Sequence, residues 1–110
     1  MIIELITTLA VGLVAVLLGI INMTGNISSI HEYHRKRVRD EDVKPFGRLV
    51  GLGTVIIGVA VMIFGGVLFA FEKTGFVLLA PIGTAVLVIG LIVGLIISFY
   101  AMKKYNGGIF

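Results

Sequence analysis

Residues 49–71 read LVGLGTVIIGVAVMIFGGVLFAF, and this uncharged run of 23 residues decides the fold. A helix needs about 20 mostly apolar residues to cross the hydrocarbon core of a bilayer. In lipid the backbone must satisfy its own hydrogen bonds, so a run that is apolar on all sides predicts a helix. The strands of a transmembrane barrel would alternate apolar and polar residues, and this run has no such alternation.

Two more apolar runs flank it. Residues 76–100 form a run of 25 without a charge, and residues 2–21 contain only the charge of Glu4. An acid stands where a signal peptide would carry basic residues, so we expect the first run to be a retained helix. With 58% hydrophobic and only 14% charged residues, the chain is too apolar for a soluble domain of 110 residues.

The sequence therefore predicts an all-α integral membrane protein with a single membrane domain. Its three transmembrane helices are expected at about residues 2–22, 47–71 and 76–101, joined by a basic loop at 23–46 and an outer hairpin turn at 72–75. A turn this short makes the second and third helices antiparallel neighbours.

Basic residues gather on one side of the predicted spans. In a chain with three spans the loop and the C-terminal tail share a side, and together they hold most of the positive charge. The residues concerned are Arg35, Lys36, Arg37, Arg39, Lys44, Arg48, Lys103 and Lys104, whereas the hairpin turn holds Lys73 alone. This bias predicts a multi-pass protein of the cell (inner or plasma) membrane, with its N-terminus outside and its basic loop and C-terminus in the cytoplasm.

The polar loop contains the signals of a short surface helix. Ser29 followed by Glu32 matches a capping box, which predicts a cytoplasmic interfacial helix over about residues 30–39. Acidic residues 40–42 come next, and the helix dipole favours acids at a helix N-terminus, so Asp40 is the predicted N-cap of the second span. The acidic residues could instead hold a cation, but capping and pairing with neighbouring Arg is the favoured interpretation.

Glycine is about twice as frequent as in an average protein, with 15 among 110 residues. Many recur at a spacing of seven residues, which is nearly two helical turns and keeps them on one helix face. They are Gly12 and Gly19 in the first span, Gly51, Gly58 and Gly65 in the second, and Gly83 and Gly90, followed by Gly94, in the third. Small residues let helix backbones approach closely in lipid. The pattern predicts a close, left-handed antiparallel packing of the helices, either within one chain or between chains.

The loop also holds the candidates for ligand binding. His31 and His34 would share a face of the predicted surface helix and could bind a metal, but a zinc site needs three or four ligands and the chain has no Cys. Contact with headgroups or solvent is favoured, and no metal or cofactor is expected. A basic stretch abuts a span, which predicts contact with anionic lipid headgroups and not with nucleic acid. Its members are Arg35, Lys36, Arg37 and Arg39.

The spans themselves carry little chemistry. Proton-coupled transporters place ionisable residues at mid-membrane, and the predicted spans have none there, since Glu4 lies at the outer rim. Thr54 and Thr84 are the deepest polar residues of the second and third spans, and such hydroxyls usually bond their own helix backbone. The sequence shows no catalytic triad, phosphate loop or carboxylate pair, so we do not expect an enzyme.

The loop and the start of the second span carry a family resemblance. Residues 25–35, GNISSIHEYHR, and residues 44–51, KPFGRLVG, resemble a family of small uncharacterised prokaryotic multispanning membrane proteins, a domain of unknown function. In that family a short basic, acid-rich loop leads to a Phe-Gly-Lys/Arg pattern that opens a glycine-rich helix. The resemblance implies that Phe46, Gly47 and Arg48 belong to this pattern, and it implies no activity.

The favoured hypothesis is a small, non-catalytic accessory or interaction subunit of a larger membrane complex. The alternative is a homo-oligomeric channel or small-solute transporter, which would need several copies because three helices do not enclose a pore. A second alternative is an envelope protein that binds anionic lipid through its basic loop. The expected partners are thus the bilayer with its anionic headgroups, a second copy of the chain or a larger membrane protein.

Overall fold

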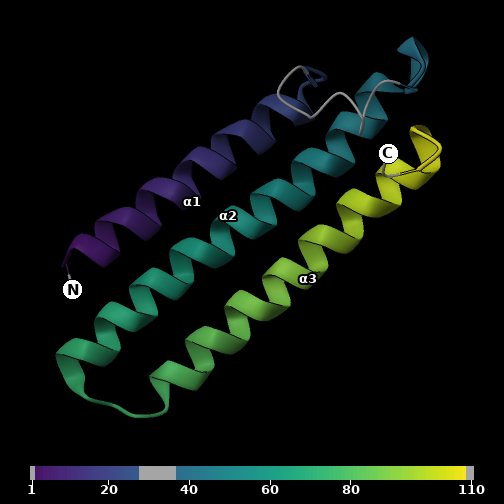
Figure 1. The fold of residues 1–110 in the computed structure, drawn as a ribbon. Helices are drawn as coiled ribbons and strands as arrows, with labels where there is room; N and C mark the ends of the chain where they lie inside the picture. The colour runs from purple at the N-terminus through teal and green to yellow at the C-terminus, as the bar shows by residue number, and fades with distance from the viewer. Residues whose placement is uncertain (1, 28–36, 109–110) are drawn as a thin grey trace.

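A computed structural model describes residues 2–27 and 37–108 of the chain. Its long helices are α1 (Ile2–Met23), α2 (Val43–Thr74) and α3 (Leu79–Tyr105), and one 3₁₀ turn, η2 (Asp40–Asp42), precedes α2 (Figure 1). All three long helices have the length and composition needed to cross a membrane. The prediction of an all-helical fold with three helices that could span a membrane is therefore confirmed for the described residues.

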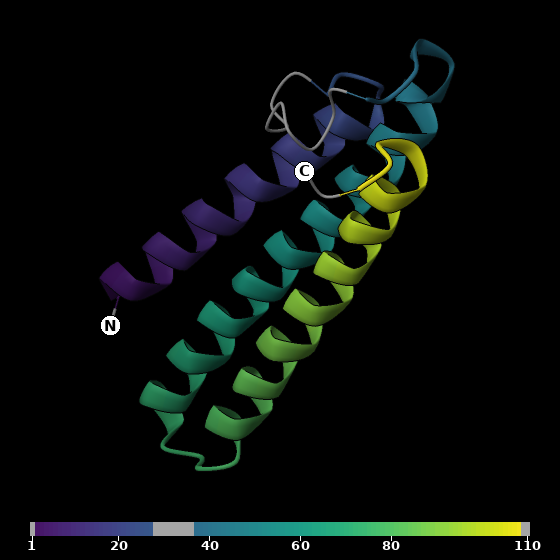
Figure 2. The same ribbon diagram turned by 45° about the vertical axis from the view of Figure 1, so that its right-hand side comes forward.

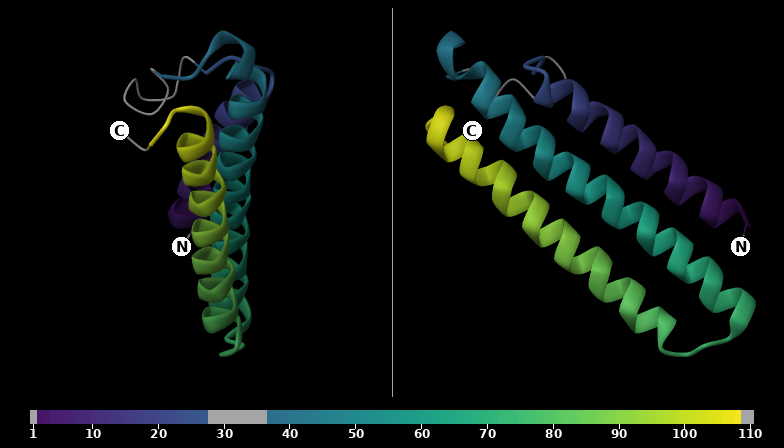
Figure 3. Two further views of the ribbon diagram at one scale, coloured as in Figure 1. Left: turned by 90° about the vertical axis from the view of Figure 1, so that its right-hand side faces the viewer. Right: turned by 180° about the vertical axis from the view of Figure 1, so that it is seen from behind.

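The central helix is α2, with α1 along one side of it and α3 along the other (Figure 1 and the right view of Figure 3). Because α2 has 32 residues, it is about 48 Å long at 1.5 Å per residue, whereas the hydrocarbon core is about 30 Å thick. The ends of the helices therefore extend beyond the apolar layer. Figure 2 shows the last turn of α3 beside the first turns of α2, at the end where the loop from α1 arrives.

The hairpin between α2 and α3 lies further along the chain than predicted. The structure continues α2 through Glu72, Lys73 and Thr74, so the turn begins at Gly75 and not at residue 72. Gly75 has a left-handed φ of 70°, and its N–H donates to the Phe71 carbonyl at 2.7 Å. The physical reason is that nothing before this glycine stops helix propagation, and glycine adopts the left-handed cap without steric cost.

The N-terminal boundary of α2 also differs from the prediction. Asp40 is not the N-cap, because η2 adds a short turn and Asp42 takes the N-cap position without a side-chain hydrogen bond to the backbone. The end of the predicted interfacial helix is not supported either, since residues 37–39 are not helical. The remainder of that predicted helix, with its capping box, lies outside the described residues.

Glycines of α1 and α2 meet along one face of each helix. A Cβ atom at Gly19 would lie 2.6 Å from the Gly51 carbonyl oxygen, and one at Gly12 would lie 2.6 Å from the Gly58 carbonyl oxygen. Further toward the hairpin, Gly65 faces the side chain of Thr8 and not the backbone. At Gly12 and Gly19 the backbones are thus too close for any side chain, which is the packing that small residues allow in lipid.

The opposite face of α2 packs against α3. A Cβ atom at Gly53 would lie 2.5 Å from the Gly94 carbonyl oxygen, and Gly90 abuts the methyl group of Ala60. At the hairpin end, a Cβ atom at Gly83 would lie 3.0 Å from the side chain of Val67. Gly53, Ala60 and Val67 repeat at seven residues, as do the glycines that face α1. The structure thus places the predicted glycine faces of all three helices at contacts within one chain.

Candidate functional site

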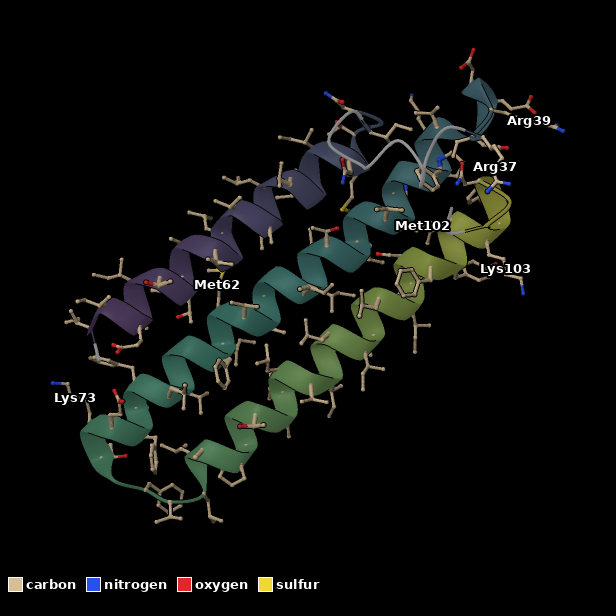
Figure 4. The ribbon with its side chains drawn as sticks, viewed as in Figure 1. Arg37, Arg39, Met62, Lys73, Met102 and Lys103 are labelled. Atoms are coloured by element: carbon tan, nitrogen blue, oxygen red, sulfur yellow. The ribbon has the colours of Figure 1, made fainter. Side chains whose placement is uncertain are left out.

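Most of the described basic side chains lie at one end of the molecule, which we call the basic end. It comprises the start of α2, the residues before it and the end of α3. Figure 4 shows Arg37, Arg39 and Lys103 together at this end, whereas Lys73 lies at the opposite, hairpin end. The exposed basic residues of the basic end are Arg37, Arg39, Lys44, Arg48, Lys103 and Lys104. This end is the most polar surface that the described helices present, so we take it as the candidate site.

A small buried core lies beneath the charges of the basic end. Phe46 is fully buried and packs with Val50, Ala101 and Met102, so the core joins the first turns of α2 to the last turns of α3. The ring of Tyr105 meets the Phe46 ring edge to face, with centroids 6.4 Å apart and planes at 81°. Ile27 and Val38, which flank the loop, pack against the same core. Phe46 of the family-like pattern is thus a packing residue.

The side chain of Asn106 forms a hydrogen bond that links the chain before α2 to the end of α3. Its side chain is fully buried, and its Oδ1 atom accepts a hydrogen bond of 2.7 Å from the Arg37 backbone N–H. Its Nδ2 atom donates to the Gly108 carbonyl at 3.0 Å. Gly107 ends the helix with a left-handed φ of 75°, which turns the chain back over Asn106. Asn-Gly-Gly directly after a helix is a sequence signal for this terminal turn, but it does not indicate Arg37 as the partner of Asn106.

Replacing Asn106 by Ala should lower the free energy of unfolding by about 1 kcal/mol. The substitution removes the acceptor of the Arg37 N–H and the donor to Gly108, and the cost is at the low end of the range for an unmade bond because both partners can reach water. Thermal unfolding in mild detergent would measure the change. Asn106→Asp should lose at least as much, because it buries a carboxylate and replaces the donor to the Gly108 carbonyl by a second oxygen; equal stability of the wild type and the Ala variant would contradict this role of Asn106.

Two of the four predicted headgroup residues lie within the part of the chain that the structure describes. Arg37 and Arg39 are exposed at the basic end, as a headgroup contact requires. The guanidinium Nη1 of Arg39 lies 3.6 Å from Glu41 Oε1, but both side chains are more than 70% exposed, so this ion pair adds little stability. Arg35 and Lys36, together with the candidate metal pair His31 and His34, lie outside the described residues.

Sequence reasoning missed a groove at the end of α3. The groove has a volume of about 560 Å³ and is lined by Ile96, Phe99, Tyr100, Lys103, Gly107 and Gly108. Beside it the Nζ atom of Lys104 lies 5.8 Å from the ring centroid of Tyr100 and 5.3 Å from that of Tyr105, within the range of cation–π attraction. The sequence signal is an aromatic pair at the end of a span, followed after two residues by a Lys pair.

Three threonine hydroxyl groups inside the helices donate hydrogen bonds to the backbone of their own helix. Thr54 donates to the Val50 carbonyl at 2.9 Å, and Thr84 donates to the Ala80 carbonyl at 3.0 Å. Thr8 donates to the carbonyl oxygens of Glu4 and Leu5. The protons of these hydroxyls are therefore engaged within their own helices. A second groove, about 410 Å³ in volume, lies between α2 and α3 at mid-span, and its lining is apolar: Val55, Ile56, Val59, Ala60, Ile63, Val86, Ile89 and Gly90.

The geometry thus offers an apolar groove at mid-span and a basic, partly aromatic surface at one end. Within the residues that the structure describes, no group of three or more His, Asp or Glu side chains could hold a metal ion. Comparison of the chain with protein-family models, with curated proteins and with solved structures found no match.

Proposed function

We propose that the protein is a non-catalytic accessory subunit that binds a larger membrane protein through the mid-span groove between α2 and α3. The observation that carries the proposal is the character of this groove, which is apolar and has the small residues Ala60 and Gly90 in its lining. Ala60 and Gly90 already pack against each other within the chain, so a partner helix would contact the groove through its exposed apolar edges, formed by Ile63 and Ile89.

The polar groups of the spans support a non-catalytic role. Thr8, Thr54 and Thr84 donate to their own helix backbones, so their protons are not directed at a substrate. The uncharged runs at residues 49–71 and 76–100 contain no Asp, Glu, His, Lys or Arg that could couple to protons or ions. Such a composition favours a role in binding over a role in catalysis or transport.

The homo-oligomeric channel has less support than the accessory role. A channel needs several copies to associate, and Gly90 and Gly94 form a GxxxG pair of the kind that joins helices in lipid. This face, however, packs against Ala60, Ile57 and Gly53 of the same chain. A second copy would therefore need another surface. Association through the mid-span groove remains open to a second copy, and the experiment below distinguishes the two occupants by mass.

The orientation belongs to the same proposal. The basic end lies in the cytoplasm, since the excess of Lys and Arg is retained on that side of the membrane. The chain has no Cys, so a single cysteine at Thr74 can report the position of the hairpin. A membrane-impermeant maleimide should label it in intact cells; labelling only after permeabilisation would reverse the orientation.

A photo-crosslinking amino acid at Ile63 should form a discrete adduct with another membrane protein in the native membrane. Ile63 lines the groove and is 44% exposed, so a side chain there reaches any helix that the groove holds. Denaturing electrophoresis and mass spectrometry would identify the adduct. The matched control is Ile6 on α1, which is 60% exposed and lies outside the groove, and we expect no such adduct from it.

Other outcomes of the crosslinking experiment contradict the proposal. An adduct of two chains, at twice 11.8 kDa, would make the groove a self-association surface and favour the homo-oligomer. Adducts with lipid alone at both positions would show that the groove holds no protein partner. The native mass of the complex, extracted from its own membrane in mild detergent, gives an independent measurement of which partner is present.

A further inference from the structure

The groove at the end of α3 differs from the mid-span groove because it combines apolar and charged walls. Ile96, Phe99 and Tyr100 form its apolar part, and Lys103, Gly107 and Gly108 form its polar rim. The apolar side chains are exposed, with Ile96 at 61% and Tyr100 at 55%. More than half of each of these two side chains is open, so a molecule that seats there would meet both walls.

The position of the two walls matches the depth profile of a bilayer. The uncharged run ends at residue 100, and Lys103 is in the next turn of the same helix. From Ile96 to Lys103 the helix rises about 10 Å at 1.5 Å per residue. The apolar wall therefore lies at the depth of acyl chains when the Lys103 ammonium group lies among the headgroups.

The charge around the polar rim is positive. A Cβ atom at Gly107 would lie 3.9 Å from the Cζ atom of Arg37, so a guanidinium group stands next to the rim. The groove lining contains no acidic residue. The acids nearest in the sequence to Arg37 are those of η2, and none of them lines the groove. Such a rim favours a ligand with a negative charge.

The two lysines at the end of α3 have different surroundings. The Nζ atom of Lys104 lies near the rings of both Tyr100 and Tyr105, so this ammonium group has an aromatic environment within the protein. The side chain of Lys103 lines the groove. Lys103 is thus the lysine of the groove lining, whereas the ammonium group of Lys104 lies beside the two tyrosine rings.

We propose that the end of α3 binds one anionic phospholipid, with the phosphate at Lys103 and an acyl chain along Ile96, Phe99 and Tyr100. This site is separate from the basic stretch of the loop, which the sequence suggested as a headgroup contact. The site is also separate from the mid-span groove, so a test of the lipid site does not test the accessory role proposed above.

Titration of the delipidated protein with phosphatidylglycerol in detergent, followed by native mass spectrometry, tests the site. The wild type should retain one phosphatidylglycerol and bind phosphatidylcholine more weakly. Lys103→Gln should weaken phosphatidylglycerol binding about fivefold, the change that corresponds to the loss of about 1 kcal/mol per basic residue near the surface. Lys103→Arg retains the charge and should bind as the wild type does.

Lys73→Gln is the matched control. Lys73 also lies near an aromatic ring, with its Nζ atom 5.4 Å from the Phe69 centroid, but it is at the hairpin end, so its removal should leave lipid binding unchanged. Equal binding by the wild type and Lys103→Gln would overturn the site. Equal losses in the Lys73 and Lys103 variants would also overturn it, because the effect would then come from net charge.

The source of the phosphate is tested separately. Glycerol 3-phosphate at millimolar concentration should not displace the lipid, because it has no acyl chain to contact Ile96 and Phe99. Displacement would show that the headgroup alone is recognised and would overturn the acyl-chain part of the site. Far-UV circular dichroism checks that each variant remains helical.

Discussion

Replacement of Phe46 by Ala should lower the free energy of unfolding by about 3–5 kcal/mol, the cost typical of removing a buried Phe. Phe46 is fully buried at the basic end, where it contacts Val50, Ala101 and Met102 and meets the Tyr105 ring. Its removal leaves a cavity between α2 and α3 that backbone shifts can fill only in part. SDS titration of the protein in mixed micelles would measure the change in stability.

Phe76→Ala is the control for this prediction. Phe76 is in the hairpin between α2 and α3 and is 54% exposed, so its truncation removes few contacts within the protein. We expect a loss well below 1 kcal/mol for this variant. If both Phe variants lost the same stability, the small core at the basic end would not be what joins α2 to α3.

Replacement of Gly51 by Leu should lower the free energy of unfolding by about 2 kcal/mol and separate α1 from α2. A Cβ atom at Gly51 would meet the Gly19 carbonyl oxygen and lie 2.9 Å from the Met23 backbone nitrogen. Both are backbone atoms, which yield only if α1 moves. Overpacking of this kind costs up to about 3 kcal/mol, and the better helix propensity of Leu returns about 1 kcal/mol.

Gly66→Leu provides a control in the same helix. No atom lies within 4 Å of a Cβ placed at Gly66, so the substitution should be neutral or stabilising through helix propensity alone. Amide hydrogen exchange of α1 distinguishes the two variants, because it should accelerate in Gly51→Leu and stay at the wild-type rate in Gly66→Leu. Acceleration in both variants would mean that any Leu in α2 disturbs the bilayer contact, and not that Gly51 is an interface residue.

These glycine contacts decide which surfaces remain for partners. The face of α2 with Gly51 and Gly58 is closed by α1, and the face with Gly53 and Ala60 is closed by α3. Substitutions at Gly90 and Gly94 should therefore disturb packing within the chain before they affect any association between chains. A partner helix has access to the groove edge formed by Ile63 and Ile89, which are 44% and 61% exposed.

The sequence by itself determined the class of the protein and the number of its long helices. Uncharged runs of 23 and 25 residues leave no alternative to membrane helices, because lipid offers no hydrogen-bond partner to the backbone. The spacing of Gly51, Gly58 and Gly65 also identified one helix face, since seven residues are nearly two turns. These conclusions depend on local composition and periodicity, which need no knowledge of neighbouring elements.

The sequence did not determine where the helices end. Apolar runs measure the hydrocarbon core, but helical hydrogen bonds continue into the headgroup region until a residue such as Gly75 stops them. This is why α2 includes Glu72 and Lys73, which the sequence had placed in the turn. At the other end, η2 shifted the start of α2 from the predicted cap at Asp40 to Val43.

Only the tertiary structure decided which face meets which helix. Gly51 and Gly53 are two residues apart, or about 200° around the helix, so they serve opposite neighbours, but periodicity describes a face without naming its partner. The fastening of Arg37 to Asn106 is likewise invisible in the sequence, because it joins residues 69 positions apart. Contacts between distant residues depend on how the helices are placed in space, and that placement brought the end of α3 to the start of α2.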